Sequence, residues 1–161
     1  MLCTSASGVR NNGNLAHWRG MATLTFMPQP LPEDLLDLLR KPSPCFVATL
    51  MPDGSPQLTE TWVHTDGEHV VINIVDGHQK ARNIARDPRV AVNIADPDDI
   101  RRFYAVRGRV SAVTTEGGRE SIDEISHKYL GIPYPNFSGN PDETRLIVTI
   151  EADKITPPMG G

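Results

Sequence analysis

Apolar residues recur at helical spacing in three segments of the chain. The first segment, about residues 32–41, follows Pro32 and two acidic residues and ends at Lys41-Pro42, which is typical of a short helix. Its apolar side is formed by Leu35, Leu36, Leu38 and Leu39. Ala81, Ile84 and Ala85 predict a second helix that closes at Asp87-Pro88. The third helix has Gly131 as its C-terminal cap, and its predicted apolar side is Ile122, Ile125, Tyr129 and Leu130.

The remaining apolar runs are rich in β-branched residues and predict strands. Six strands are expected, at residues 45–50, 55–64, 69–75, 90–95, about 103–114 and 144–152. Asp-Gly pairs at 53–54, 66–67 and 76–77 favour consecutive antiparallel hairpins. Residues 132–143 contain three prolines and are expected to form a loop. The pattern predicts a mainly β (α+β) protein whose antiparallel strands close into a barrel, because closure removes exposed sheet edges.

Composition narrows the class of protein. A chain of 161 residues suits one domain, and we expect it at 28–161, after a disordered N-terminal extension at 1–27 that is rich in Ser, Asn and Gly. The net charge of −4 argues against a nucleic-acid partner, and no apolar stretch approaches the roughly 20 residues of a membrane helix. Cys3 and Cys45 form neither a disulfide framework nor a zinc spacing. A reducing, cytoplasmic setting is expected.

The sequence contains none of the common motifs by which side chains alone catalyse a reaction. The five histidines show no metal-binding spacing, and there is no nucleophile elbow, Walker loop or Gly-x-Gly-x-x-Gly turn. No catalytic residue is therefore assigned, and no metal is expected. A bound cofactor would have to perform the chemistry.

The segment Asp76–Pro88 has the character of an anion site. A strand ends at a tight turn and a short basic helix follows at once, with Lys80 near its start and Arg82 and Asn83 one turn later. Free N–H groups of a first helical turn beside a lysine make a cradle for a phosphate. A solvated basic face on an ordinary surface helix remains the alternative.

Polar side chains line one face of the predicted strand at 55–64. By the period of two, Gln57, Thr59 and Thr61 share a face, opposite Leu58, Glu60 and Trp62. The three polar groups could bond the edge of a heteroaromatic ring, or they could form the outward face of the strand. Asn73 interrupts an apolar strand, and a buried amide needs hydrogen-bond partners.

Several motifs together resemble the pyridoxamine-phosphate-oxidase-like split-barrel superfamily. They are Ala-Thr-Leu-x-x-Asp-Gly-x-Pro-Gln at 48–57, Lys-Ala-Arg-Asn-Ile-x-Arg-Asp-Pro-Arg-Val at 80–90 and Val-Arg-Gly-Arg-Val at 106–110. The segment from Ile122-Asp123 to Gly131, followed by Pro133-Tyr134-Pro135, is similar to the actinobacterial flavin/deazaflavin oxidoreductases of the B group. The resemblance extends from about Leu31 to Met159.

The resemblance implies a homodimer of six-stranded split barrels of the FMN-binding type, with the cofactor in a groove between the subunits. Lys80 matches the phosphate-binding lysine, the strand at 57–61 would follow the ring, and Asn83 would lie near the phosphate. Together the implied cofactor contacts are Gln57, Leu58, Thr59, Glu60, Thr61, Asn73, Ile74, His78, Gln79, Lys80 and Asn83.

Three departures from the family pattern bear on the cofactor. His78, Gln79 and Gln57 stand where relatives or flavin-mononucleotide (FMN) oxidases carry arginine. The loss of positive charge disfavours FMN and leaves the deazaflavin coenzyme F-420 as the first choice.

The expected activity is hydride transfer from the reduced deazaflavin to a conjugated small-molecule substrate such as an enone, quinone or tetrapyrrole, with solvent or Tyr104 as proton source. An FMN-dependent oxidoreductase is one alternative. The other is a non-catalytic carrier of F-420 or of haem, the haem being held by His78 or His64.

Overall fold

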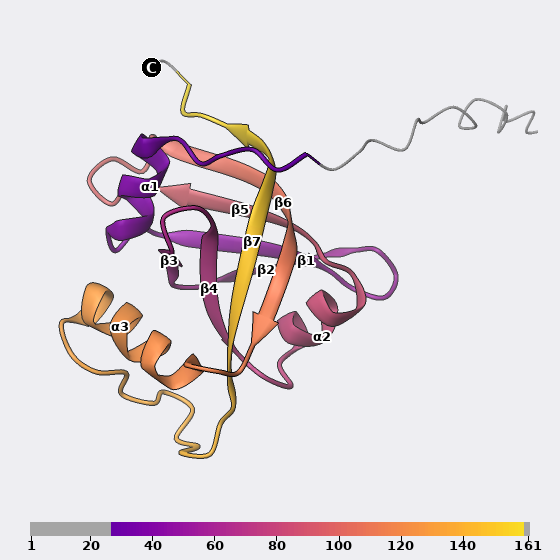
Figure 1. The fold of residues 1–161 in the computed structure, drawn as a ribbon, viewed down its shortest axis with the longest axis vertical. Helices are drawn as coiled ribbons and strands as arrows, with labels where there is room; N and C mark the ends of the chain where they lie inside the picture. The colour runs from indigo at the N-terminus through magenta and orange to yellow at the C-terminus, as the bar shows by residue number, and fades with distance from the viewer. Residues whose placement is uncertain (1–26, 160–161) are drawn as a thin grey trace, which may run out of the picture.

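Seven strands form one antiparallel sheet in the part of the chain that the computed structural model describes, residues 27–159 (Figure 1). They are β1 (Cys45–Leu50), β2 (Pro56–Glu60), β3 (Val63–Thr65), β4 (Val70–Val75), β5 (Arg89–Ala95), β6 (Phe103–Thr114) and β7 (Arg145–Thr156). Their order across the sheet is β2-β1-β5-β6-β7-β4-β3. The predicted mainly β class is confirmed.

The sheet is curled into a half-barrel because its two edge strands are neighbours in the sequence. β2 and β3 lie at opposite edges, yet only Thr61 and Trp62 separate them. The three residue steps from Glu60 to Val63 span at most about 11 Å, so the edges must approach each other. β2 keeps one side of its backbone unpaired, and this open side forms the split in the barrel.

The expectation of six strands is corrected at this junction. The predicted strand 55–64 is two strands, because the chain changes partners between Glu60 and Val63: β2 pairs with β1, whereas β3 pairs with β4. The Thr61 N–H still donates to the Cys45 carbonyl (3.0 Å), but the Val63 N–H donates to the hydroxyl of Tyr129 (3.2 Å). No glycine or proline marks the break.

Two of the three predicted Asp-Gly hairpins are confirmed. Asp53-Gly54 joins β1 to β2 and Asp66-Gly67 joins β3 to β4. The third pair, Asp76-Gly77, forms no hairpin, since β4 pairs with the distant β7. It leads into α2, the helix that the sequence predicts directly after this turn. The last strand also continues to Thr156, beyond the predicted end at residue 152, because its final residues pair with the start of β6.

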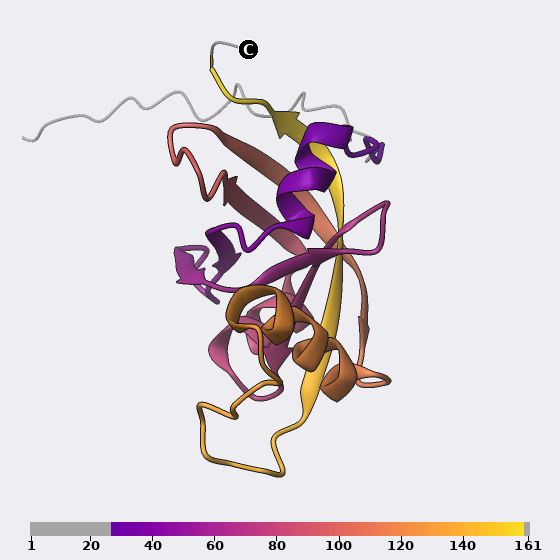
Figure 2. The same ribbon diagram turned by 90° about the vertical axis from the view of Figure 1, so that its left-hand side faces the viewer.

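Three helices lie at the margins of the sheet: α1 (Glu33–Arg40), α2 (Gln79–Arg86) and α3 (Gly118–Leu130). In both views α1 and α3 lie toward opposite ends of the sheet (Figures 1 and 2), and α2 packs against β1 and β4. The leucines of α1 are buried as predicted, and Gly131 caps α3 with a φ of 74°. Leu130 departs from the predicted apolar side of α3 and is exposed.

The predicted N-terminal extension at 1–27 lies outside the described residues, apart from the exposed Met27. Across residues 27–159, none of the helices has the length and apolar character needed to cross a membrane.

Candidate cofactor site

Within residues 27–159, the start of α2 is an uncapped helical turn beside a lysine that has no counter-ion. Gly77 (φ 78°) turns the chain, His78 is the N-cap residue, and no side chain bonds to the first turn. The first N–H groups of a helix have no intrahelical acceptor, and no acidic residue lies in this turn. The site therefore offers hydrogen-bond donors and positive potential to an anion.

Lys80 extends from this turn into the protein. Its side chain is half-buried, and burial lowers the pKa of its ammonium. Among residues 27–159 the ammonium forms neither a hydrogen bond nor an ion pair, although it lies close enough to Cys45 for each group to shift the other's pKa. A partly desolvated ammonium without a partner is stabilised by binding an anion.

Asn83 connects α2 to β1 and β2 through side-chain hydrogen bonds. It is fully buried, and its amide nitrogen donates to Gln57 Oε1 (3.0 Å) and Thr49 Oγ1 (3.0 Å). Its amide oxygen accepts from Gln79 Nε2 (2.8 Å). Asn83 thus positions Gln57 and Gln79, and it has no exposed surface of its own.

Gln57 and Gln79 differ in which of their side-chain atoms remain free to bond a ligand. The Gln57 Oε1 atom is held by Asn83, whereas its Nε2 forms no hydrogen bond within the described part of the chain. Both ends of the Gln79 side chain are used inside α2, toward Asn83 and Arg82. Only the backbone N–H of Gln79 remains for a ligand. His78 is exposed at the N-cap.

β2 presents two different surfaces. Gln57 and Thr59 are half-buried and share a face, while Leu58 and Glu60 are exposed on the other. The Oγ1 atom of Thr59 is buried and has no hydrogen-bond partner among the described residues, so a ligand could supply one. The predicted common face of Gln57 and Thr59 is confirmed.

The Leu58 and Glu60 side chains do not join this face, but their backbones reach the split. The pairing of Thr61 with Cys45 and of Met51 with Ser55 fixes which peptide groups of β2 point toward β1. By alternation, the N–H and C=O groups of Leu58 and Glu60 point to the open edge. On this face they can contact a ligand only through the backbone, whereas Glu60 also borders a pocket at the Thr61 end of β2.

Two predicted residues lie on β4. Asn73 is only 6% exposed; its Nδ2 donates to the Gly118 carbonyl (2.7 Å), and its Oδ1 has no partner. Ile74 lies in the hydrophobic core, and its backbone is paired with Leu146 of β7. The structure therefore separates Ile74 from the polar groups around Lys80.

The sequence did not reveal an aromatic pocket at the Thr61 end of β2, with a volume of about 320 Å³. Trp62 stacks on Tyr129 (centroids 5.1 Å apart), and Tyr134 and Phe137 meet it edge-on at 6.1 and 6.2 Å. The lining residues are Glu60, Thr61, Trp62, Asn73, Ile122, Tyr134, Phe137 and Arg145. The aromatic residues at 129–137 were the available signal.

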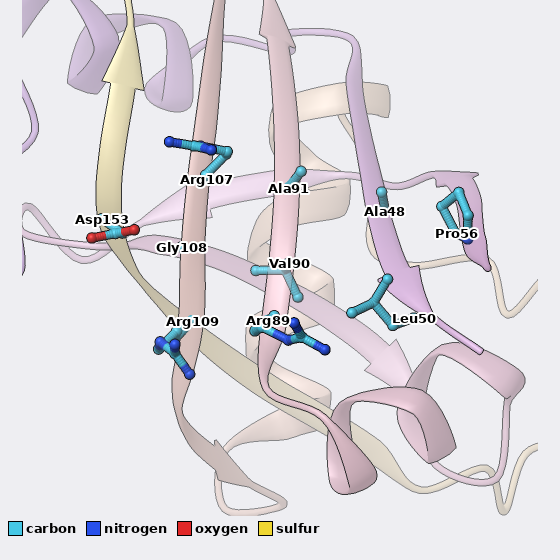
Figure 3. A pocket seen from close by; sticks show the side chains of 10 residues that line it. All are labelled: Ala48, Leu50, Pro56, Arg89, Val90, Ala91, Arg107, Gly108, Arg109 and Asp153. Atoms are coloured by element: carbon cyan, nitrogen blue, oxygen red, sulfur yellow. The ribbon is translucent and has the colours of Figure 1, made fainter. Parts of the chain in front are cut away.

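A second hollow, of about 340 Å³, lies on the outer face of β1, β5 and β6 (Figure 3). Arg89, Arg107 and Arg109 surround a floor that includes Ala48 and Ala91. None of the predicted cofactor contacts lines this hollow.

Two further expectations concern chemistry. Tyr104, considered as a proton source, is buried in the core, and burial raises the pKa of its hydroxyl. His64 and His78, considered as haem ligands, lie on β3 and at the N-cap of α2. Residues 27–159 contain no cluster of three or more His, Cys, Asp or Glu side chains able to hold a metal ion.

Comparison with known proteins identifies the fold. The family model described as pyridoxamine 5'-phosphate oxidase matches residues 31–156. An F-420 reductase of known structure is 29% identical, covers 78% of this chain and 98% of its own, and has a TM-score of 0.65.

Two more distant structures are similar in fold alone. A conserved hypothetical protein from Mycobacterium tuberculosis is 24% identical over 80% of this chain and 84% of its own (TM-score 0.59). A putative pyridoxamine 5'-phosphate oxidase from Listeria innocua is 20% identical over 78% of this chain and 95% of its own (TM-score 0.58). With its curled antiparallel sheet and a match over most of its length, the chain belongs to the pyridoxamine 5'-phosphate oxidase family.

Proposed function

We propose that this protein is an oxidoreductase that binds coenzyme F-420 by its phosphate. The observation that carries this proposal is the half-buried ammonium of Lys80, which lies beside the uncapped first turn of α2 and has no counter-ion in the part of the chain that the structure describes. The similarity to an F-420 reductase supports the choice of cofactor. A cytoplasmic location remains a prediction.

The residues around Lys80 fit a phosphate-bearing ring system. Lys80 and the N–H groups of the first turn of α2 would hold the phosphate. Gln57 Nε2 and Thr59 Oγ1, which have no partner, would bond the molecule as it follows β2. The open edge at Leu58 and Glu60 would add backbone contacts.

Charge favours the deazaflavin over FMN. A terminal phosphate monoester carries about −1.5 to −2 at pH 7, whereas the phosphodiester of F-420 carries a single charge. Gln57 and Gln79 are neutral, and Arg82, which bonds to Gln79 and to the Gly77 carbonyl, is exposed. Lys80 is therefore the half-buried charge of the site, and one such charge matches the phosphodiester more closely.

When bound, the reduced deazaflavin supplies a hydride to an electrophilic carbon of a conjugated organic substrate, and a proton completes the reduction. The protein's part is to anchor the phosphate, orient the ring along β2 and exclude water from the groove. Since Tyr104 is buried in the core, solvent is the proton source in this proposal.

Exposed apolar side chains on the outer face of the sheet support the proposal of a homodimer. This face carries the arginine-lined hollow, and on it Phe46 is 38% exposed, Leu58 66% and Phe103 39%. Exposed apolar side chains grouped on one sheet face are typical of an interface. A second copy on this face would border the groove beside β2.

Fluorescence titration of the purified protein with F-420, and separately with FMN, tests the proposal. We expect saturable F-420 binding in the micromolar range and weaker FMN binding. Oxidation of the reduced cofactor with menadione or cyclohexenone then tests turnover. Preference for FMN would favour the FMN-dependent oxidoreductase, and F-420 binding without turnover would favour a carrier.

A further inference from the structure

Met51 directly follows β1 and turns its sulfur toward α2, the helix that carries Lys80. The Met51 Sδ atom lies 3.4 Å from Asn83 Nδ2, within hydrogen-bond distance of a sulfur acceptor. The preceding residue, Leu50, lines the hollow on the outer face of the sheet, so a second copy on that face would leave the Met51 sulfur uncovered. Met51 is half-buried, and small molecules in solvent can reach its side chain.

An arginine fixes the orientation of the Asn83 amide. The Arg86 guanidinium carries only hydrogen-bond donors, and its Nη2 atom lies 3.1 Å from the Asn83 oxygen. The Asn83 Nδ2 group therefore faces the opposite way, toward Thr49, Gln57 and Met51. Asn83 is fully buried, so its amide cannot turn to solvent instead.

The Asn83 Nδ2 group faces more acceptors than it has hydrogen atoms. It carries two N–H bonds, but within the described part of the chain three acceptors surround it: Thr49 Oγ1 and Gln57 Oε1, each at 3.0 Å, and the Met51 sulfur. A thioether sulfur is a weak acceptor, so the two oxygens hold the two hydrogens. The bond to Gln57 depends on the sulfur remaining the weakest of the three.

Oxidation of the Met51 sulfur would reverse this order. In the reaction with hydrogen peroxide, a sulfur lone pair attacks one peroxide oxygen, the S–O bond forms and the O–O bond breaks. The proton on the transferred oxygen passes through solvent to the departing hydroxide, which leaves as water, so sulfur loses the two electrons that peroxide gains. The product is methionine sulfoxide, which is polar, and its oxygen is a far stronger acceptor than the thioether.

Of the two oxygens bonded to Asn83, Gln57 Oε1 is the one that can be displaced. Thr49 is fully buried on β1 and cannot move away. Gln57 is half-buried at the split, and its Oε1 atom also accepts a weaker bond from Thr49 Oγ1 (3.3 Å). The unbranched methionine side chain is flexible, so the sulfoxide oxygen can turn toward Asn83.

We propose that Met51 is a reversible oxidation site that controls the position of Gln57 through Asn83. The sulfoxide oxygen takes one Asn83 N–H bond, and Gln57 loses its attachment to α2. Weaker binding of F-420 follows, because Gln57 Nε2 then no longer faces the cofactor; this consequence rests on the proposed function. Methionine sulfoxide reductases restore the thioether, and with it the bond to Gln57.

Side-chain amide signals in NMR spectra test the proposal without any cofactor. The isotopically labelled full chain is treated with hydrogen peroxide, and mass spectrometry follows the oxidation of each methionine. We expect half-buried Met51 to react, but more slowly than Met27 and Met159, which are 68% and 96% exposed. The amide signals of Asn83 and Gln57 should shift as Met51 reacts and return after treatment with methionine sulfoxide reductases.

Titration with F-420 measures the consequence for the proposed cofactor site. After removal of the peroxide, the oxidised wild type should bind F-420 roughly 2- to 10-fold more weakly than the untreated protein, the factor for one neutral hydrogen bond. Met51→Leu has no sulfur at this position, so peroxide should not change its affinity. Met159→Leu removes an exposed methionine instead and should retain the full effect of peroxide.

Met51→Gln imitates the oxidised protein without peroxide. The glutamine side chain places a carbonyl oxygen, which is a strong acceptor, near the position of the sulfoxide oxygen. We expect this variant to shift the Asn83 and Gln57 signals and to weaken F-420 binding as oxidation does.

The possible failures are distinguishable. Unshifted Asn83 and Gln57 signals in protein whose Met51 is oxidised would overturn the proposal, as would a Met51 that resists peroxide while Met27 and Met159 react. Shifted signals with unchanged F-420 affinity would overturn control of the cofactor site. If F-420 does not bind to the untreated protein, the proposed function falls, and the amide signals still decide whether Met51 controls Gln57.

Discussion

Asn83 connects the helix that carries Lys80 to the strand that carries Gln57. Its amide is fully used by Thr49, Gln57 and Gln79, so the residue aligns the proposed phosphate site with the proposed ring site. The resemblance pointed to Asn83 as a neighbour of the phosphate. The structure adds that its action would be indirect, through the side chains that it holds.

Thr59→Val is predicted to separate ligand binding from folding. The Thr59 hydroxyl is buried without a partner, so valine, which has the same shape, should leave the free energy of unfolding unchanged or slightly higher. Affinity for F-420 should fall by about 0.5–1.5 kcal/mol, the usual value of one hydrogen bond. Denaturant unfolding and F-420 titration measure the two effects.

A Thr59→Val protein that is clearly less stable would contradict this prediction, because the hydroxyl would then have a structural role. Thr156→Val, at an exposed threonine at the end of β7, is the matched control and should change neither quantity.

The sequence placed Gln57 and Thr59 on a common face and Lys80 in the first turn of a helix, and the structure agrees. That these residues bind a cofactor stays a prediction. The side chains of Leu58 and Glu60 point away from the face of Gln57 and Thr59, because side chains alternate along a strand, and Glu60 borders the aromatic pocket instead. The aromatic pocket combines residues of four elements and a loop, and no local pattern reports such a distant grouping.

At the scale of elements, α3 holds the junction between β2 and β3. Lys128 donates to the carbonyls of Leu39 (2.7 Å) and Val63, and the Tyr129 hydroxyl donates to the Ser43 carbonyl (2.7 Å). These contacts attach α3 to the end of α1 and to the start of β3. The change of strand partners depends on them, which explains why the sequence around Thr61 gave no sign of a break.

Lys128 predicts a pH dependence of stability. Burial lowers the pKa of its ammonium from 10.5 to about 8. Between these values the unfolded chain binds a proton that the folded protein has released, so the contribution of Lys128 to stability rises with pH. The advantage of the wild type over Lys128→Met should therefore increase from pH 8 to pH 10.

Denaturant unfolding of both proteins at several pH values measures this difference. Lys154→Met, at an exposed position on β7, is the control and should show no trend. A difference between wild type and Lys128→Met that stays constant or shrinks with rising pH would contradict the prediction.

The predicted helices and strands were correct where the local sequence pattern determines the structure. The expected ranges agree closely with those of α1, β1, β4, β5 and β6. The errors at β2, β3 and the end of β7 arise where partners far apart in the sequence determine pairing. At Asp76-Gly77 the expected helix follows, but the expected hairpin does not form, because β4 takes the distant β7 as its partner.

At the scale of the whole molecule, the exposed face of β1, β2, β5 and β6 predicts a homodimer. Light scattering coupled to size exclusion should give twice the mass of the chain. Phe46→Arg places a charge on this face and should shift the protein toward monomer and weaken F-420 binding. Ile100→Arg, at an exposed residue on the β5–β6 loop, should leave the mass unchanged.

A wild-type protein that runs as a monomer would contradict the dimer prediction. A dimer that persists unchanged in Phe46→Arg would show that another surface forms the interface.

Titration of wild type and Lys80→Ala with F-420 tests the central claim most directly. Loss of the charge-assisted bond should weaken binding by about 1.5–3 kcal/mol, or roughly 10- to 150-fold. Lys41→Ala, which removes the same charge at the end of α1, should bind like the wild type. Unchanged F-420 affinity in Lys80→Ala would contradict the assignment of this site.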